Sequence, residues 1–301
     1  MTKLKGWIVY NGNLREGKFL DFANWVKEAA SRKGIEAIII KNNELLVTVE
    51  NGKSTIKGPF EHKKPDFVIF GDKDILLARQ LEALGVPVFN SADSIEKCDH
   101  KGRMYQVLAD HQLPVPKTII APMIFSGMDV IDDTPYRQIG EELGYPLVIK
   151  EAYGSFGQQV YLIEDAEALL VKIKQLGGTP YVLQEYIQTS HGKDIRLNVV
   201  GEKIVASMIR KSSSDFRANV SAGGKMETYF PSEEEKELAI ACSRTLGTNF
   251  AGVDLLFGEN DKRYICEVNS NAHIRSIFDC TGINVADTMI DFIIEKLKES
   301  K

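Results

Sequence analysis

Cysteine is scarce in the sequence, and no two cysteines have the spacing of a metal site or a redox pair. The four cysteines are scattered over 301 residues, without a Cys-x-x-Cys motif or a histidine at ligand spacing. Disulfide frameworks and zinc sites both require paired spacings, so free thiols in a reducing compartment are expected. These cysteines are Cys98, Cys242, Cys266 and Cys280.

Long hydrophobic runs and an excess of positive charge are also missing. No apolar stretch is long enough to cross a membrane, and the first residues, MTKLKGWIVYNG, contain too short an apolar run for a secretory signal. The 37 Lys and Arg are outnumbered by 42 Asp and Glu, which gives a formal net charge of -5. We therefore expect a cytoplasmic protein that binds neither nucleic acid nor membrane, although a local group of cations could still bind a phosphate-rich small molecule.

The N-terminal third, residues 1–97, alternates between short apolar strands and amphipathic helices. This alternation predicts an α/β domain with a parallel sheet. No GxGxxG motif follows its first strand, so a dinucleotide-dependent oxidoreductase has little support. The expected strands are 6–10, 36–40, 65–71 and 86–90, and the expected helices are 19–34 and 74–85.

Two further units are expected, a central one at 98–186 and a C-terminal one at 187–301. The central unit begins with two helical pieces that end at prolines, and its stretch 122–140 has a weak periodicity that suggests a mobile excursion. Together the three units give a mixed α/β (α+β) fold class. The expected elements are strands at 145–150, 160–165 and 181–187, hairpins at 194–211 and 251–269, and helices at 166–177, 232–246 and 285–297.

Acidic and amide side chains stand on two strands that are expected to pair. In YICEVNSNAH, Glu267 and Asn269 are two residues apart and share one face, and Asp254 is the single charge in AGVDLLF on the partner strand. Carboxylate and amide oxygens are hard ligands that suit Mg²⁺ or Mn²⁺, with phosphate oxygens and waters completing the shell. The alternative is a solvated polar edge without a metal.

Lysines and glycines that could hold phosphates occur near the start of the central unit. Lys150 closes the apolar strand YPLVIK, and Gly154 and Gly157 follow in the next loop, where glycine lets backbone N–H groups approach phosphate oxygens. Lys101 opens the helix HKGRMYQVLADH. The alternatives are an ordinary hairpin turn and a solvated lysine.

Further polar and charged residues lie at the end of the strand VLQEYI and between it and the acid-bearing hairpin. Arginine is suited to hold developing phosphoryl or oxyanion charge, because its planar fork donates several hydrogen bonds. Any charged residue after this strand could also be in a surface ion pair that contributes little, and Glu185 and Tyr186 could belong to a strand edge that passes into a loop. The full set is Glu185 and Tyr186, Asp194 and Arg196, Arg210, and Arg217 and Asn219.

In this order and spacing the motifs resemble the ATP-grasp superfamily, and within it the RimK-like glutamate ligases. The resemblance runs from Lys101 to the C-terminus, and the N-terminal unit resembles a pre-ATP-grasp domain only in its general pattern. It rests on the stretches LVIKEAYGSFGQQVYL, LQEYI, DIRLNVVGEKIVASMIRK, DFRANVSAGG, and AGVDLLF with ICEVNSN and TGINVA.

The resemblance implies a role for each candidate residue. It implies ATP as a substrate and two divalent ions, Mg²⁺ or Mn²⁺, as cofactors. Lys101, Lys150 and the loop with Gly154 and Gly157 would contact the phosphates. The remaining implied roles are adenine and ribose for Glu185 and Tyr186, ribose for Asp194, the γ-phosphate and reacting carboxylate for Arg210, Arg217 and Asn219, and metal for Asp254, Glu267 and Asn269.

The implied activity is an ATP-dependent carboxylate–amine ligase that forms an amide through an acyl phosphate. It would add glutamate or another amino acid to a small-molecule or carrier-protein acceptor, and a homo-oligomer is compatible with the resemblance. Two alternatives remain, a natural-product or dipeptide ligase and a nucleotide-binding regulatory protein. The sequence names neither the acceptor nor the number of residues added.

One stretch departs from the pattern of ligases that modify ribosomal proteins. Those members follow the metal motif with a Ser-Pro-Gly type turn, whereas this sequence reads NSNAHIRSIFDCTG. Asn271 is similar to the Asn-x-Asn arrangement of the branch that acts on biosynthetic carrier proteins or small cofactors. His273 and Arg275 stand where a substrate should approach, and Arg275 could bind an acceptor carboxylate or form a structural ion pair.

Overall fold

The N-terminal sheet of the protein is fully parallel, in the strand order β2-β1-β5-β6. The computed structural model describes residues 3–14, 17–128, 130–154, 157–219 and 223–299. Parallel strands carry helices on both faces, so they must be apolar on both. The elements are β1 (Lys5–Tyr10), α1 (Gly17–Arg32), β2 (Glu36–Lys41), β3 (Leu46–Glu50), β4 (Lys53–Lys57), β5 (Phe67–Gly71), α2 (Ile75–Ala83) and β6 (Val88–Phe89).

Alternate residues of this sheet enter two different cores. Ile8 and Phe67 pack with α1 and with the C-terminal helix α9 (Val285–Glu299). Trp7 and Val68 face the other way and pack with α2. The parallel sheet and its flanking helices confirm the prediction for this part, whereas the hairpin of β3 and β4 is an element that the sequence pattern missed.

The central part holds an antiparallel sheet in the order β7-β10-β8-β9. Leu147 and Ile149 on β8 pack against α5 and α6. Val148 and Lys150 alternate with them and face a cavity on the opposite side. The elements are α3 (Ala92–Asp99), α4 (Lys101–Asp110), β7 (Thr118–Ile120), α5 (Thr134–Leu143), β8 (Leu147–Glu151), β9 (Val160–Ile163), α6 (Ala166–Leu176) and β10 (Tyr181–Glu185).

The interpretation of 122–140 as an irregular excursion is wrong for its second half. α5 begins at Thr134, with Pro135 in its first turn, and buries Tyr136 against the central sheet. Proline is favoured there because its missing N–H would have no partner in the first turn. In the first part of the stretch, 122–133, the described residues form neither helix nor strand, as expected.

The C-terminal part is built on a five-stranded sheet in the order β13-β12-β11-β14-β15. Helix α7 covers one face, where Leu197 and Val253 join its core. The opposite face carries Arg196 and Asp254, which are register partners. The elements are β11 (Lys193–Val200), β12 (Lys203–Lys211), β13 (Lys225–Thr228), α7 (Glu233–Leu246), β14 (Phe250–Phe257), β15 (Arg263–Asn269) and α8 (Arg275–Thr281), with short 3-10 turns at Asn42–Glu44, Gln188–Ser190 and Glu259–Asp261.

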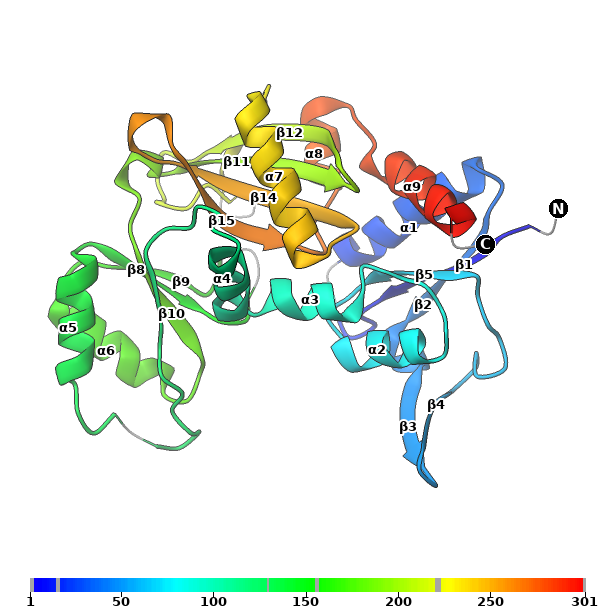
Figure 1. Ribbon diagram of the computed structural model, residues 1–301, viewed down its shortest axis with the longest axis horizontal. Helices are drawn as coiled ribbons and strands as arrows, with labels where there is room; N and C mark the ends of the chain where they lie inside the picture. The colour runs from blue at the N-terminus through cyan, green and yellow to red at the C-terminus, as the bar shows by residue number, and fades with distance from the viewer. Residues whose placement is uncertain (1–2, 15–16, 129, 155–156, 220–222, 300–301) are drawn as a thin grey trace.

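Figure 1 shows the three sheets in space, with the central sheet and α5 and α6 at one end and the N-terminal sheet at the other. The C-terminal sheet lies between them, and α9 runs beside α1. None of the helices in the described ranges is both long and apolar enough to cross a membrane. The mixed α/β fold class is confirmed, and the domain limits at 97/98 and 186/187 stay predictions.

Candidate active site

Two neighbouring cavities bring together the residues singled out in the sequence. The first spans about 870 Å³ of empty space, part of it open to solvent, and lies between the central and C-terminal sheets. Its lining includes Lys101, Lys150, Gly154, Gly157, Glu185, Tyr186, Asp194, Arg210, Arg217, Asn219, Asp254 and Glu267. The second, of about 1440 Å³, is lined by Asn269, Asn271, His273 and Arg275 among others. The two cavities share Gly154, Arg210, Asn219 and Glu267 in their linings, so they adjoin, and together they are called the cleft below.

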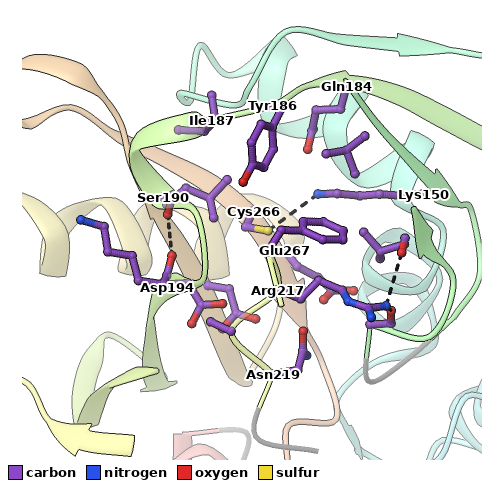
Figure 2. A pocket seen from close by; sticks show the side chains of 18 of the residues that line it. Lys150, Gln184, Tyr186, Ile187, Ser190, Asp194, Arg217, Asn219, Cys266 and Glu267 are labelled. Atoms are coloured by element: carbon purple, nitrogen blue, oxygen red, sulfur yellow. Dashed lines mark hydrogen bonds between the residues drawn. The ribbon is translucent and has the colours of Figure 1, made fainter. Parts of the chain in front are cut away.

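Lys150 enters the first cavity from β8 and is almost fully buried. Its Nζ donates to the hydroxyl of Tyr105, 2.9 Å away, and lies 3.7 Å from Sγ of Cys266. The Tyr105 hydroxyl in turn donates to the carbonyl of Cys266 at 2.6 Å. Figure 2 shows Lys150 extended toward Cys266 below Gln184 and Tyr186. Contacts from α4 and β15 therefore fix the ammonium group before any ligand arrives.

Lys101 approaches the same cavity from the first turn of α4. The side chain of His100 caps this helix by accepting a hydrogen bond from the N–H of Arg103. Lys101 is 5% exposed, and its Nζ lies 3.4 Å from the carbonyl of Gly154 and 3.4 Å from Oε1 of Glu267. Two ammonium groups thus line the same cavity from separate elements, and their contact with phosphates stays a prediction.

The glycine loop after β8 packs directly against the segment that carries Arg217 and Asn219. Gly157 has φ +72°, and a Cβ there would lie 2.8 Å from Oδ1 of Asn219. Nη1 of Arg217 donates to the carbonyl of Gly157 at 2.5 Å. Gly157 is therefore required both by its backbone conformation and by the close approach of Asn219.

Four charged side chains form a buried network on the inner face of the C-terminal sheet. Arg210 donates to both oxygens of Asp194, at 2.6 and 2.7 Å, and its Nη2 lies 3.0 Å from Oδ2 of Asp254. Arg196 donates to both oxygens of Asp254, one of them at 2.7 Å. Burial alone would raise the pKa of Asp254, but Arg196 and Arg210 outweigh it and lower that pKa. Asp194 lines the first cavity and accepts both hydrogen bonds from Arg210, and its role at a ribose stays a prediction.

The predicted metal ligands share one face of the β14–β15 pair. Asp254 is opposite Glu267, and Asn269 is opposite Gly252. No group of three or more His, Cys, Asp or Glu side chains in the described ranges is arranged to hold a metal. The predicted set has only two carboxylates, and Nδ2 of Asn269 is buried without a hydrogen-bond partner. Carboxylate and amide oxygens suit Mg²⁺ or Mn²⁺. Asp254 is hydrogen-bonded to Arg196 and paired with Arg210 here, and it would have to break these contacts to bind an ion. The metal site therefore stays a prediction.

Glu185 and Tyr186 lie at the end of β10, as expected for a nucleotide edge. Oε1 of Glu185 accepts a hydrogen bond of 2.6 Å from the backbone N–H of Lys117, so this carboxylate is directed toward the segment that precedes β7. The strand ends at Glu185, so the backbone of Tyr186 and Ile187 continues past the ladder beside the cavity. Their roles at adenine and ribose remain predictions.

Arg275 lines the second cavity but is held by the N-terminal part. It donates to both carboxylate oxygens of Asp21, at 2.9 and 2.6 Å, and stacks 4.1 Å from the ring of Trp25. Of the two interpretations of Arg275, an acceptor-binding residue or a structural ion pair, these contacts correspond to the structural ion pair. His273 has its ring 5.2 Å from that of Phe19, so α1 contributes to this wall.

Some residues of the cleft were not singled out as site residues. Gln184 is 2% exposed within the apolar run YVLQ and donates to Thr118 at 2.7 Å, and a polar residue in a buried strand was the signal for it. Tyr105 and Cys266 had no such signal, because one belongs to an amphipathic helix and the other to an alternating strand. Lys73 of the N-terminal part and Asp99 at the end of α3 form an ion pair in the second cavity.

Comparisons with known proteins agree with this geometry. A model of the RimK-like ATP-grasp domain matches residues 98–293. Beta-citrylglutamate synthase B of Danio rerio is 30% identical over 292 residues, covering 90% of this chain and 69% of the relative. A probable alpha-L-glutamate ligase of Legionella pneumophila is 34% identical over 224 residues, covering 73% and 71%.

Among solved structures, the VanG D-Ala:D-Ser ligase of Enterococcus faecalis matches with a TM-score of 0.76. The match covers 98% of this chain and 100% of that one at 19% identity. At this level of identity the likeness concerns the fold alone. The same overall arrangement of sheets is therefore present in a ligase of divergent sequence.

Proposed function

Because the chain belongs to the RimK-like ATP-grasp family, we propose that this ligase couples ATP cleavage to amide formation between a carboxylate and an amine. One partner is glutamate or another amino acid, and the other is a small-molecule or protein acceptor. The names of the two sequence relatives, a citrylglutamate synthase and a glutamate ligase, support glutamate as the first candidate.

The set of residues that the two adjoining cavities share is the observation that carries this proposal. The first holds the lysines, the glycine loop and the strand end that suit a nucleotide, and the second is larger and lined by polar groups of the loop after β15. The residues common to both are a cation, an amide, an acid and a glycine: Arg210, Asn219, Glu267 and Gly154. A terminal phosphate extending from the first cavity would meet an acceptor in the second at these groups.

Divalent ions would be held by Asp254, Glu267 and Asn269, with phosphate oxygens as further ligands. Bound there, two Mg²⁺ or Mn²⁺ ions would neutralise charge on the phosphates during transfer. Lys101 and Lys150 would add fixed positive charge on the same side. The ammonium group of Lys101 already faces Glu267, so it would balance that carboxylate before the nucleotide enters.

The proposed reaction has two steps at these positions. A substrate carboxylate oxygen attacks the γ-phosphorus, the bond to the β–γ bridging oxygen breaks, and ADP leaves. The resulting acyl phosphate is attacked by the amine, which loses a proton as inorganic phosphate departs. Arg210 and Arg217 would stabilise the charge that develops on the transferred group and on the acyl oxygen. The path needs no covalent bond to the protein.

The test follows the fate of oxygen and nucleotide. Purified protein is incubated with ATP, Mg²⁺, glutamate and pools of carboxylic acids or amines, and ADP release is measured. With the productive carboxylate labelled by ¹⁸O, an acyl phosphate predicts that one label moves into inorganic phosphate. The matched control is the double variant Asp254→Asn, Glu267→Gln, which should release no ADP above background.

The alternatives give different results in the same experiment. Unlabelled phosphate together with amide product would contradict the acyl phosphate. Tight ATP binding without ADP release in every pool, including amino-acid and carrier-protein pools, would favour the regulatory nucleotide-binding protein. Turnover at the wild-type rate in the double variant would show that Asp254 and Glu267 do not bind the required metal ions.

A further inference from the structure

The hairpin of β3 and β4 is a two-stranded sheet that stands apart from the other sheets. Within the described residues β3 pairs with β4 alone, and Figure 1 shows the hairpin projecting from the N-terminal part. Its turn is Asn51-Gly52, with φ of 52° and 71°, the conformation that joins tight hairpins. The outer edge of β4 already has one contact, because Nε2 of Gln80 on α2 donates to the carbonyl of Ser54 at 3.0 Å. In the described residues no third strand pairs with either edge, and two-stranded ribbons are marginally stable alone.

The two edges of this ribbon differ in composition. β3 reads LVTVE and exposes Val49 at 79% and Leu46 at 58%. β4 reads KSTIK and carries Lys53 and Lys57 at its ends, both exposed. Exposed lysines are a common protection against strand pairing, whereas a β-branched apolar edge favours it. The β3 edge is therefore the one suited to receive another strand.

The turn also determines which backbone groups of β3 point outward. A two-residue turn closes on a hydrogen-bonded pair, here Glu50 and Lys53, so Thr48, two residues back, also directs its N–H and C=O toward β4. Val47 and Val49 have the opposite parity and direct theirs away from β4. The outer edge thus offers two donors and two acceptors, spaced symmetrically about Thr48.

We propose that β3 pairs antiparallel with β3 of a second copy of this chain, about a two-fold axis that passes beside Thr48. Val47 of each copy then faces Val49 of the other as a hydrogen-bonded pair, which gives four hydrogen bonds. The product is a four-stranded sheet in the order β4-β3-β3-β4. Such an isologous contact closes on itself, so the assembly stops at a dimer.

The side chains support this register on both faces. One face would join Val47, Val49 and Ile56 of each copy, and Ile56 already belongs to the N-terminal core. On the other face Glu50 would lie opposite Leu46 of the second copy, beside the Lys57 that pairs with that leucine. Each end of the sheet then places a carboxylate two strand spacings from the ammonium group of Lys57, with Leu46 between them, and no like charges face one another across the axis.

Cross-linking across the two-fold axis tests the register directly. In the proposed dimer the two Thr48 residues form a non-hydrogen-bonded pair with Cβ atoms about 5 Å apart, which suits a disulfide. The control is Thr55→Cys on the same face of β4, where the two positions are about 14 Å apart across three strand spacings. Under copper-catalysed oxidation, Thr48→Cys should give a disulfide-linked dimer, and the wild type and Thr55→Cys should not.

Sedimentation velocity over a concentration series provides an independent readout. Val49→Lys should raise the dimer dissociation constant by about tenfold or more, because lysine replaces an apolar partner at the paired edge. Val47→Glu combined with Val49→Lys should restore the dimer, since the introduced carboxylate of each copy would then face the introduced ammonium group of the other. Val49 is largely exposed, so neither result depends on a damaged core.

Two outcomes would overturn the proposal. One is a wild-type protein that remains monomeric up to about 100 µM, together with a Thr48→Cys variant that forms no disulfide-linked dimer. The other is a dimer that is unaffected by Val49→Lys and cross-links no better through position 48 than through position 55. ATP turnover is not needed for any of these measurements, so they stand whether or not the proposed ligase reaction is correct.

Discussion

Arg196 and Asp254 are joined across β11 and β14 by two guanidinium–carboxylate hydrogen bonds. They are direct register partners in the middle of the sheet, and Arg210 reaches the same carboxylate from β12. Two cations therefore satisfy Asp254, which is one of the predicted metal ligands. A divalent ion that arrives with nucleotide phosphates would replace this cationic charge, and the phosphates would offer the freed arginines new anionic partners.

Removing the charge of Asp254 should destabilise the protein as well as abolish turnover. Asp254→Asn leaves Arg196 and part of Arg210 buried without their anion, and breaking a buried pair in this way costs about 3 kcal/mol. Urea unfolding measures the loss. The control is Asp261→Asn in the exposed turn of the same hairpin, which should leave the unfolding free energy unchanged. A stability equal to the control would show that the arginine pairs contribute nothing.

The pH dependence of that difference tests the pKa of Asp254. Burial acts to raise this pKa, but the two arginines lower it below the ordinary value. A lowered pKa in the folded state gives stability that is complete above the unfolded value, about 3.9, and that is lost as pH falls toward the folded value. The unfolding free energies of wild type and Asp254→Asn should therefore converge below about pH 4. A difference that already shrinks between pH 7 and pH 5 would indicate a raised pKa.

Alternation predicted the positions of the site residues better than it predicted their partners. Glu267 and Asn269 share a face because side chains alternate along a strand, and Lys150 faces the cavity for the same reason. The pairing of Arg275 with Asp21 could not be predicted, since it depends on how α8 and α1 pack over 254 residues of separation. The hairpin of β3 and β4 was missed although Asn51-Gly52 is a strong turn signal.

Gly157→Ala should impair turnover because of contact as well as strain. Both Gly157 and Gly127 have positive φ, at 72° and 81°, so alanine should cost about 1 kcal/mol of stability at either position. Only at Gly157 would the new methyl group meet Oδ1 of Asn219, 2.8 Å away, whereas at Gly127 nothing lies within 4 Å. We expect ATP turnover to fall in Gly157→Ala and to remain normal in Gly127→Ala. Equal activity in both would show that the Gly157–Asn219 contact has no part in the reaction.

Lys150→Met should weaken nucleotide binding with little effect on folding. Methionine fills a similar volume, and the buried Nζ now contacts mainly Tyr105 and Cys266, neither of which needs a cation. A charge-assisted contact to a phosphate contributes about 1.5–3 kcal/mol, so affinity for a non-hydrolysable ATP analogue should fall about 10- to 100-fold. Calorimetric titration measures this loss. The control is Lys172→Met, whose ammonium group lies 3.8 Å from the ring of Tyr161, outside the lining of the cleft. Equal affinity of the two variants for the ATP analogue would show that Lys150 does not contact the phosphates.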